Sequence, residues 1–179
     1  MMTEPCNPDA EKEALRTALD RGHAALRRAL EGVEDDLAAR KPAAGGWSIL
    51  ECVEHVVVSE QYLLSRLRIA QRSEPAADVE REAKIAARAA NRTRRIEAPP
   101  ESQPPGRYAS LRDAVAAFDA TRAETVRFLE QFEGDLRCWT TDHPLFPGPV
   151  TSMETLIMMA AHPGRHAEQI GEIRTALEG

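Results

Sequence analysis

The chain has 179 residues, 42% of them hydrophobic, and a formal net charge of −6. This length allows one domain with a substantial buried core, and we treat residues 1–179 as a single domain. The acidic balance argues against a nucleic-acid partner, because phosphate contacts need a surplus of Lys and Arg.

The N-terminal residues contain neither a basic start nor an apolar run. We therefore expect no leader peptide, no membrane partner and a cytoplasmic location. The three cysteines, Cys6, Cys52 and Cys138, form no C-x-x-C pair. An odd number with this spacing does not indicate a disulfide framework, and we expect reduced thiols.

The first predicted helix begins at Asn7, which can cap it, with Pro8 in its first turn. Apolar residues at helical spacing continue this amphipathic pattern to Leu37. His23 lies within the pattern but has no ligand-like residue four positions away, so we interpret it as a structural or surface histidine.

A second predicted helix follows the glycine pair at positions 45–46. Ser48 as N-cap and Glu51 three residues later form a capping box, and we expect the helix to run to about Arg72. Its expected inward face combines apolar residues with two side chains that can bind metals, and consists of Cys52, His55, Val56, Ser59, Tyr62 and Leu63.

Residues 73–109 are expected to form a long crossover. Positions 79–90 are compatible with a helix but contain few large apolar residues, and positions 98–106 are too rich in proline for regular structure. The crossover also carries a basic cluster, which we interpret as a solvated face rather than a contact patch for an acidic partner: Arg88, Arg92, Arg94 and Arg95.

Capping signals open two further helices. One begins at Ser110 and ends at Gly134, and the other begins within the capping box of residues 151–154. Four amphipathic helices with one long connection predict an all-α four-helix bundle, with the second and third helices roughly parallel if the crossover spans the bundle length. Metal sites in such bundles are built from inward side chains of facing helices.

Two histidines of the fourth helix, His162 and His166, are four residues apart on its apolar stripe. Imidazoles at this spacing lie one above the other and can bind one ion, and His55 on the second helix is the natural third ligand. The spacing also occurs by coincidence. Pro163 lies between the two histidines, so we expect the helix to kink there or to restart with Pro163 in its first turn.

Four other residues are accessory candidates. Glu51 either accepts a hydrogen bond from the second ring nitrogen of His55 or only caps the helix. Cys52 is more simply explained as a small buried hydrophobe than as a ligand. His143 and Asp142 lie on the loop before the fourth helix, as a general base or substrate contact at the pocket mouth. For His143 the alternative is a hydrogen bond that anchors the loop.

Three segments together resemble the DinB/YfiT-like superfamily of metalloenzymes: residues 46–51 followed by His55, residues 143–146, and residues 161–170. The resemblance covers most of the chain. It implies a four-helix bundle with up-down-down-up topology that often forms a homodimer. It also implies a divalent metal held by one histidine from the second helix and two from the fourth, which map onto His55, His162 and His166. The Pro163-Gly164 pair departs from the family pattern, in which helix formers usually occupy these positions.

The family includes transferases and isomerases that act with low-molecular-weight thiols. Three neutral imidazoles leave coordination positions open, so a bound ion can acidify water or hold a thiolate or carbonyl as a Lewis acid. We therefore hypothesise a divalent-metal-dependent hydrolase or thiol-dependent transferase with a small-molecule substrate. Imidazole suits zinc, nickel, copper and iron alike. The alternative hypothesis is a non-catalytic module whose histidines store or sense metal, or merely satisfy one another in the core.

Overall fold

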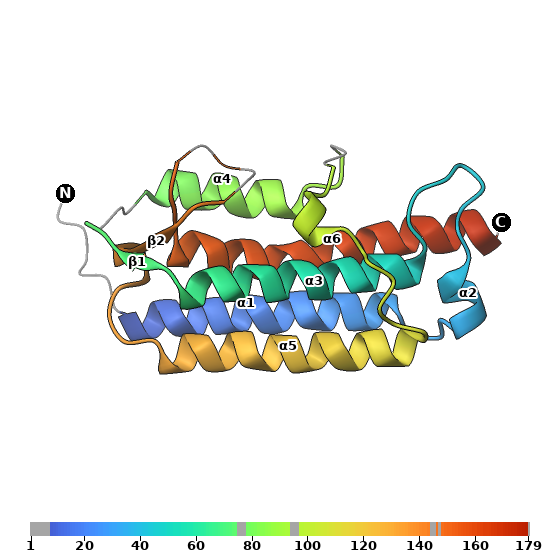
Figure 1. Cartoon of the computed structure of the whole chain (residues 1–179), viewed down its shortest axis with the longest axis horizontal. Helices are drawn as coiled ribbons and strands as arrows, with labels where there is room; N and C mark the ends of the chain where they lie inside the picture. Colours follow the sequence, from blue (N-terminus) through green and yellow to red (C-terminus); the bar gives the residue numbers. More distant parts are fainter. Residues whose placement is uncertain (1–7, 75–77, 94–96, 144–145, 147, 179) are drawn as a thin grey trace.

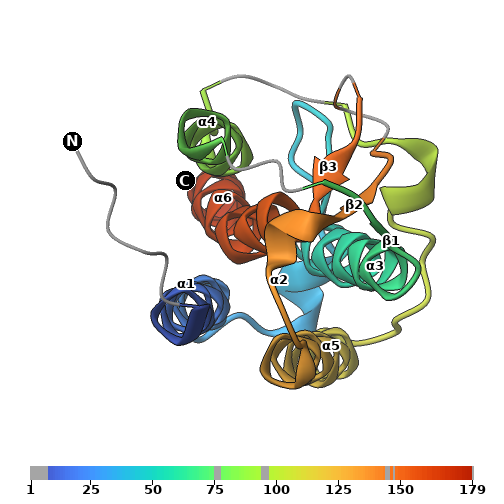
Figure 2. The ribbon, with the colours of Figure 1, turned by 90° about the vertical axis from the view of Figure 1, so that its left-hand side faces the viewer.

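Four long helices form the body of the protein in the computed structural model, which describes residues 8–74, 78–93, 97–143, 146 and 148–178. They are α1 (Pro8–Ala29), α3 (Ile49–Arg68), α5 (Leu111–Gln131) and α6 (Ser152–Glu178). Figure 1 shows them side by side along the long axis, and Figure 2 shows them packed as a bundle in cross-section. Within the described residues, no helix is long and apolar enough to cross a membrane. The chain is thus an all-α four-helix bundle.

The helix directions follow from contacts between the helices. Gln61 of α3 bonds to Thr121 of α5, and Arg68, seven residues further along α3, pairs with Glu124, so α3 and α5 run parallel. Figure 1 shows α1 and α6 running the opposite way, both from left to right. The crossover between α3 and α5 therefore returns along the whole length of the bundle.

The helix α3 is the most deeply buried element. Every residue from 52 to 60 is buried, because other elements of the chain contact it on several sides. Apolar side chains from all four helices complete the core, with Leu19, Leu26, Phe118, Leu156 and Ile170 among the most buried. Burial of such side chains contributes the main favourable term for folding. A histidine on α3 is consequently withdrawn from bulk solvent.

Three of the predicted helix ends are wrong. The helix expected to end at Gly134 ends at Gln131, with Phe132 as its C-cap. The helix expected to reach Leu37 ends at Ala29, because Gly32 adopts a left-handed φ of +72° that no α-helix continues through. A separate short helix, α2 (Asp35–Ala39), contains Leu37. The helix expected to reach Arg72 ends at Arg68, and residues 71–72 form strand β1 (Gln71–Arg72) instead.

The predicted capping residues are in place where the structure describes them. Ser48 Oγ accepts from the amide of Glu51, whose carboxylate accepts from the Ser48 amide. Thr151 and Glu154 form the same reciprocal pair before α6, and Ser110 caps α5. Asn7, the expected cap of α1, lies outside the described residues.

The crossover contains a further helix, α4 (Val79–Ala90), which packs against α6. Beyond α4, the 3₁₀ turn η1 (Pro100–Ser102) lies against α3. Glu54, buried on α3, accepts hydrogen bonds from the backbone amides of Gly106 and Arg107 and so ties the end of the crossover to the core. The crossover is thus a built part of the fold that covers one side of the bundle.

Three short strands form a sheet beside one end of the bundle. The strand β2 (Trp139–Thr141) follows the 3₁₀ turn η2 (Leu136–Cys138) and pairs antiparallel with β1 and with β3 (Val150–Thr151), in the order β1-β2-β3. The register places Thr140 opposite Gln71 and Thr151. Strands of two or three residues leave no recognisable alternation in the sequence, which is why the sequence did not predict them.

The expected restart of the fourth helix at Pro163 does not occur, because α6 continues without interruption from Ser152 to Glu178. Proline lacks the amide that would bond to the carbonyl of Met159 four residues earlier. The buried Arg122 of α5 supplies that hydrogen bond, with Nη2 3.1 Å from the Met159 oxygen. Arg122 also donates to the Leu19 carbonyl at 3.0 Å and to the Glu60 carboxylate at 2.8 Å. One guanidinium therefore links all four helices.

Candidate metal centre

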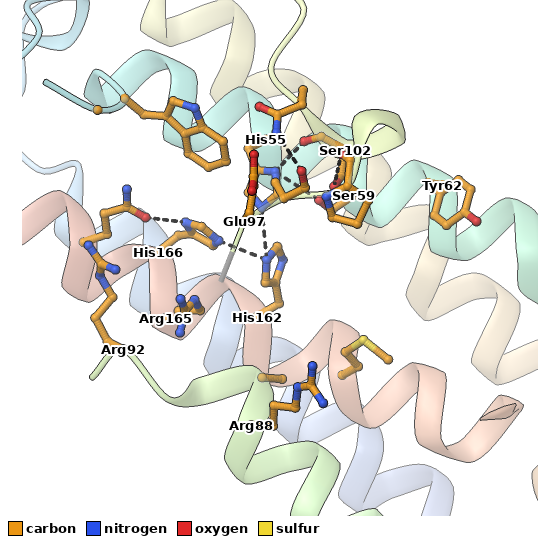
Figure 3. Close-up of a pocket in the computed structure, with 18 of the residues that line it drawn as sticks. His55, Ser59, Tyr62, Arg88, Arg92, Glu97, Ser102, His162, Arg165 and His166 are labelled. Carbon is orange, nitrogen blue, oxygen red and sulfur yellow. Dashed lines mark hydrogen bonds between the residues drawn. The ribbon is translucent and has the colours of Figure 1, made fainter. Parts of the chain in front are cut away.

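Three histidines from two helices meet at the middle of the bundle. His55 lies on α3 one turn after its capping box, and His162 and His166 lie on successive turns of α6. In Figure 3 the three rings converge beside the crossover. Their nearest nitrogen atoms all lie within 4.8 Å of one another. The structure thus brings together the three residues that the sequence selected.

The Nε2 atoms make the close approaches. His162 Nε2 lies 3.2 Å from His55 Nε2 and 2.9 Å from His166 Nε2. Two imidazole nitrogens bound to one ion at about 2.1 Å, with angles near those of octahedral or tetrahedral sites, are separated by about 3.0–3.4 Å. The two observed Nε2–Nε2 distances are close to the separation expected for nitrogen ligands of one ion.

The other ring nitrogens fix the tautomers of two histidines. His55 Nδ1 lies 2.5 Å from the backbone carbonyl oxygen of Ser102, which only accepts, so Nδ1 donates and Nε2 carries the lone pair. His166 Nδ1 donates in the same way to Gln169 Oε1 at 3.0 Å. Such contacts from outside the ligand set orient metal-binding histidines and raise their basicity.

The arrangement leaves nitrogen lone pairs facing one another. With Nδ1 protonated on His55 and His166, the Nε2 lone pairs of both rings point towards His162 Nε2. A neutral His162 has one N–H to offer and can satisfy only one of them. A cation that accepts all three lone pairs removes this conflict, so the donor set fits a divalent metal of the kind that imidazole binds.

Burial keeps the three rings neutral. It lowers the pKa of His55 to about 4, with the charge of Arg165 adding to the effect. The pKa values of His162 and His166 also lie well below the usual range, because of burial first and then of the neighbouring rings and Arg165. Neutral imidazole is the form that binds metals, so near pH 7 protons compete little for the three nitrogens.

A pocket of about 940 Å³ opens beside the three histidines. This volume is at the upper end of the usual range for small-molecule sites. Trp47 covers part of the wall, with its ring centroid 4.7 Å from that of His55 and 6.3 Å from that of His166. The rest of the wall includes apolar and charged residues: Tyr62, Leu63, Phe146, Met158, Arg88, Arg92, Arg165, Glu97, Glu101 and Glu172.

The accessory candidates differ in where the structure puts them. His143 lines the same pocket and packs edge-on against Phe146, whereas Asp142 is exposed and is not among the pocket's lining residues. Burial and the charges of Arg88 and Arg66 lower the pKa of His143 to about 4. Residues 144, 145 and 147, in the same loop, lie outside the described residues.

Glu51 and Cys52 do not take the roles of ligand or ligand support. Glu51 caps α3 and pairs with Lys41 at 2.8 Å, and the Ser102 carbonyl takes the place at His55 Nδ1 that Glu51 was considered for. Cys52 is fully buried, with its pKa raised to about 12 by burial, and it does not belong to the histidine group.

The cysteines and the remaining histidine agree with the sequence analysis where the structure describes them. Cys52 and Cys138 are free thiols, and Cys6 lies outside the described residues. His23 is a structural histidine of α1, since its Nε2 pairs with Asp119 at 2.7 Å.

Several residues of the site were not predicted from the sequence. Ser102 accepts a hydrogen bond through its backbone carbonyl oxygen and Gln169 through its side-chain amide oxygen, and no sequence pattern marks such acceptors. Gln169 could still have been predicted, because it lies three residues after His166 on the same helix. Arg88 and Arg92 were interpreted as part of a solvated face, but both line the pocket because α4 packs on α6. The other members of that cluster, Arg94 and Arg95, lie outside the described residues.

Fold and site together define a class: four-helix-bundle proteins with a cluster of three histidines, competent to hold a metal, contributed by two of the helices. The chain belongs to the DinB superfamily, whose family model matches residues 18–170. A search of curated proteins gave no significant match.

Two solved structures share the fold. YfiT from Bacillus subtilis, described as a probable metal-dependent hydrolase with an unusual four-helix bundle topology, is 15% identical with a TM-score of 0.62. The alignment covers 99% of this chain and 93% of YfiT. A conserved protein from Enterococcus faecalis is 18% identical with a TM-score of 0.65, over 93% of this chain and 96% of its own. At these identities the similarity establishes the fold.

Proposed function

We propose that the protein is a divalent-metal-dependent enzyme that holds its ion through His55, His162 and His166. The observation that carries the proposal is the convergence of three neutral imidazoles, whose Nε2 atoms lie 2.9 and 3.2 Å apart along two edges, at the wall of a pocket of about 940 Å³. A metal store or a structural site has no need of a pocket this large beside its ligands, so the geometry favours catalysis.

The reaction class we propose is hydrolysis or transfer to a small thiol. YfiT, which shares the fold, is described as a probable metal-dependent hydrolase. An ion bound by three neutral nitrogens keeps coordination positions open and supplies a Lewis acid that acidifies water or a thiol. The pocket contains no cysteine among the described residues, and in this proposal the attacking water or thiol enters with the substrates.

The chain's own residues have three tasks in this proposal. Ser102 and Gln169 hold the rings of His55 and His166 with Nε2 towards the pocket. Trp47 packs over two of the rings and limits the access of water. His143, neutral at pH 7 because of its lowered pKa, is available as a general base within the pocket.

The ion content of the protein tests the proposal. The chain should be purified without a polyhistidine tag, and its metal measured per chain by mass spectrometry beside His55→Gln and His166→Gln. We expect one transition-metal ion per chain in the natural sequence and a loss of at least tenfold in affinity in each variant. His23→Gln, which lies outside the pocket, is the matched control. A protein that binds no metal, purified or titrated, would refute the proposal.

Trp47 provides an independent signal for the same event. The chain has two tryptophans. The second, Trp139 in β2, packs against Phe132. In a Trp139→Phe background, Trp47 fluorescence should change with one equivalent of nickel or copper, because its ring lies against two of the proposed ligands. Unchanged fluorescence while metal binds elsewhere on the chain would contradict the assigned site.

Activity separates an enzyme from a store. The metal-loaded and the metal-free protein should be compared on a panel of esters and amides, and on a panel of electrophiles with small thiols. Turnover that requires both the ion and His55 supports the proposal. Metal binding without turnover on any panel favours storage or sensing, and activity that ignores the ion contradicts the mechanism. The same preparations show by sedimentation whether the chain forms the homodimer that we propose from its family.

A further inference from the structure

The negative and the positive side chains of the pocket differ in their exposure to solvent. Glu97 and Glu101 are exposed, and the side chain of Glu172 is 57% exposed. Arg165 is only 7% exposed, and the side chain of Arg92 is 24% exposed. The carboxylates therefore face solvent, where water screens them, while the poorly hydrated charge of the pocket is positive.

The positive charge lies next to the three histidines. Arg165 directly precedes His166 on α6, and Arg92 follows the end of α4, which packs on the same helix. In Figure 3 both arginines lie on the same side of the three rings. The two positive charges oppose one another, and the carboxylates of Glu168 and Glu172 offset part of this repulsion. A single anion between them would relieve this repulsion.

The proposed metal centre would add further positive charge to this part of the pocket. Three imidazoles contribute no negative charge, so a divalent ion would stand in the pocket uncompensated by its ligands, close to the guanidinium of Arg165. Proteins pair poorly hydrated charges with opposite charges, because an isolated one is costly in a medium of low dielectric constant. Among the described residues, no carboxylate joins the three nitrogens, so the substrate is the natural source of the negative charge.

We propose that this pocket selects small substrates that carry a carboxylate, and that Arg165 and Arg92 bind this carboxylate while the reacting bond lies at the histidines. The position of the reacting bond rests on the proposed function, whereas the carboxylate site does not. The planar guanidinium fork matches the two oxygens of a carboxylate and binds them in parallel hydrogen bonds. Tyr62, Leu63 and Met158 line the same pocket and are suited to an apolar part of the substrate.

Glu172 sets the affinity of the carboxylate site. Its Oε2 accepts from Arg92 Nη2 at 2.8 Å, so it competes for one of the two arginines. A substrate carboxylate would share Arg92 with Glu172 or displace it towards solvent. Removing the charge of Glu172 should therefore strengthen the binding of a carboxylate, a direction of change that simple damage to the fold would not produce.

The test uses the metal-free protein, so that no ion can bind the probe. Benzoate, phenylacetate and 4-phenylbutyrate are compared by titration calorimetry with their uncharged primary amides, and phenylphosphonate is included to separate a carboxylate from a phosphate-like group. We expect at least one carboxylate to bind tenfold or more tightly than its amide, and more tightly than the phosphonate. Glu172→Gln should strengthen this binding several-fold, and Arg92→Met and Arg165→Met should each weaken it about tenfold.

Arg112→Met is the matched control, because this arginine lies on α5 with its side chain 91% exposed and should leave the affinities unchanged. If Arg165→Met fails to fold, Arg92→Met and Glu172→Gln still decide, since both side chains are partly exposed. Amides that bind as tightly as carboxylates, or carboxylates that do not bind at all, overturn the proposal. A preference for the phosphonate assigns the site to phosphate-like groups and also overturns it.

The outcome is independent of the metal experiment. Carboxylate binding by a chain that takes up no metal would keep the carboxylate site and remove the proposed enzyme. Metal uptake without any preference for carboxylates would do the reverse.

Discussion

Gly22 of α1 lies against the backbone of α6 at Ala160, so close that a Cβ atom on Gly22 would clash with the Ala160 carbonyl oxygen. The contact falls two residues before His162, and the Pro163 side chain lies beside it. Glycine is thus required here to let two helices approach, although its backbone is ordinary helix. This close approach fixes the part of α6 that carries the histidines.

Gly22→Ala should therefore destabilise the protein. The obstructing atom is backbone and cannot rotate away, so α1 and α6 must separate, at a cost of about 1–3 kcal/mol or more. Gly171→Ala is the matched control, because this exposed α6 glycine has open space around its Cβ position, and alanine there should stabilise by about 0.5–1 kcal/mol. Urea unfolding followed by circular dichroism measures both. Equal effects of the two changes would contradict the reported contact.

Arg122→Met should cost about 3–5 kcal/mol of unfolding free energy, because it leaves the buried Glu60 carboxylate without its ion-pair partner. It also removes the donor to the Met159 carbonyl that Pro163 leaves open. The double change Arg122→Met with Glu60→Gln should recover part of the loss, since no buried charge then remains unpaired. Thermal unfolding of the single and double variants checks the order, and a double variant less stable than Arg122→Met would contradict it.

The sequence predicted the parts of the structure that depend on short-range patterns. The helical spacing and the capping pairs at Ser48 and Thr151 specify where α3 and α6 begin, because these hydrogen bonds join residues three apart. The His162 and His166 pair is equally local. The third histidine could be selected because a bundle leaves few inward polar side chains unexplained, and the structure brings it to the other two.

The parts that the sequence did not predict depend on contacts between distant segments. Arg122 is 37 residues from Met159, so nothing near Pro163 shows how its lost hydrogen bond is replaced. Ser102 acts on His55 through a backbone oxygen 47 residues away, and a backbone oxygen has no residue type. Arg92 looked like a surface residue because α4 contains few large apolar side chains, and only its packing on α6 brings Arg92 to the pocket.

Gln169→Ala should weaken metal binding without unfolding the protein. The amide oxygen of Gln169 accepts from His166 Nδ1 at 3.0 Å, and its loss frees the ring to rotate and to move its proton to Nε2. Loss of such a partner typically lowers metal affinity by about 10- to 100-fold. Competition with a chromogenic chelator gives the affinity. Gln169→Glu, which keeps an acceptor at this position, should lose much less, and an equal loss in both variants would rule out the hydrogen bond as the cause.

His143 should make the metal-free protein less stable in mild acid. Its pKa is about 4 in the folded chain, because of burial and the charges of Arg88 and Arg66, against about 6.5 when unfolded. Between these values the unfolded chain binds more protons, so the contribution of neutral His143 is complete above pH 6.5 and is lost as the pH falls towards 4. The stability difference between the natural chain and His143→Gln, measured in urea from pH 7.5 to 4.5, should shrink over this window. Arg88→Gln removes one of the opposing charges, so it should raise the folded pKa of His143 and narrow the window from its acidic side. A stability difference that does not depend on pH would show that the ring titrates as it does in the unfolded chain.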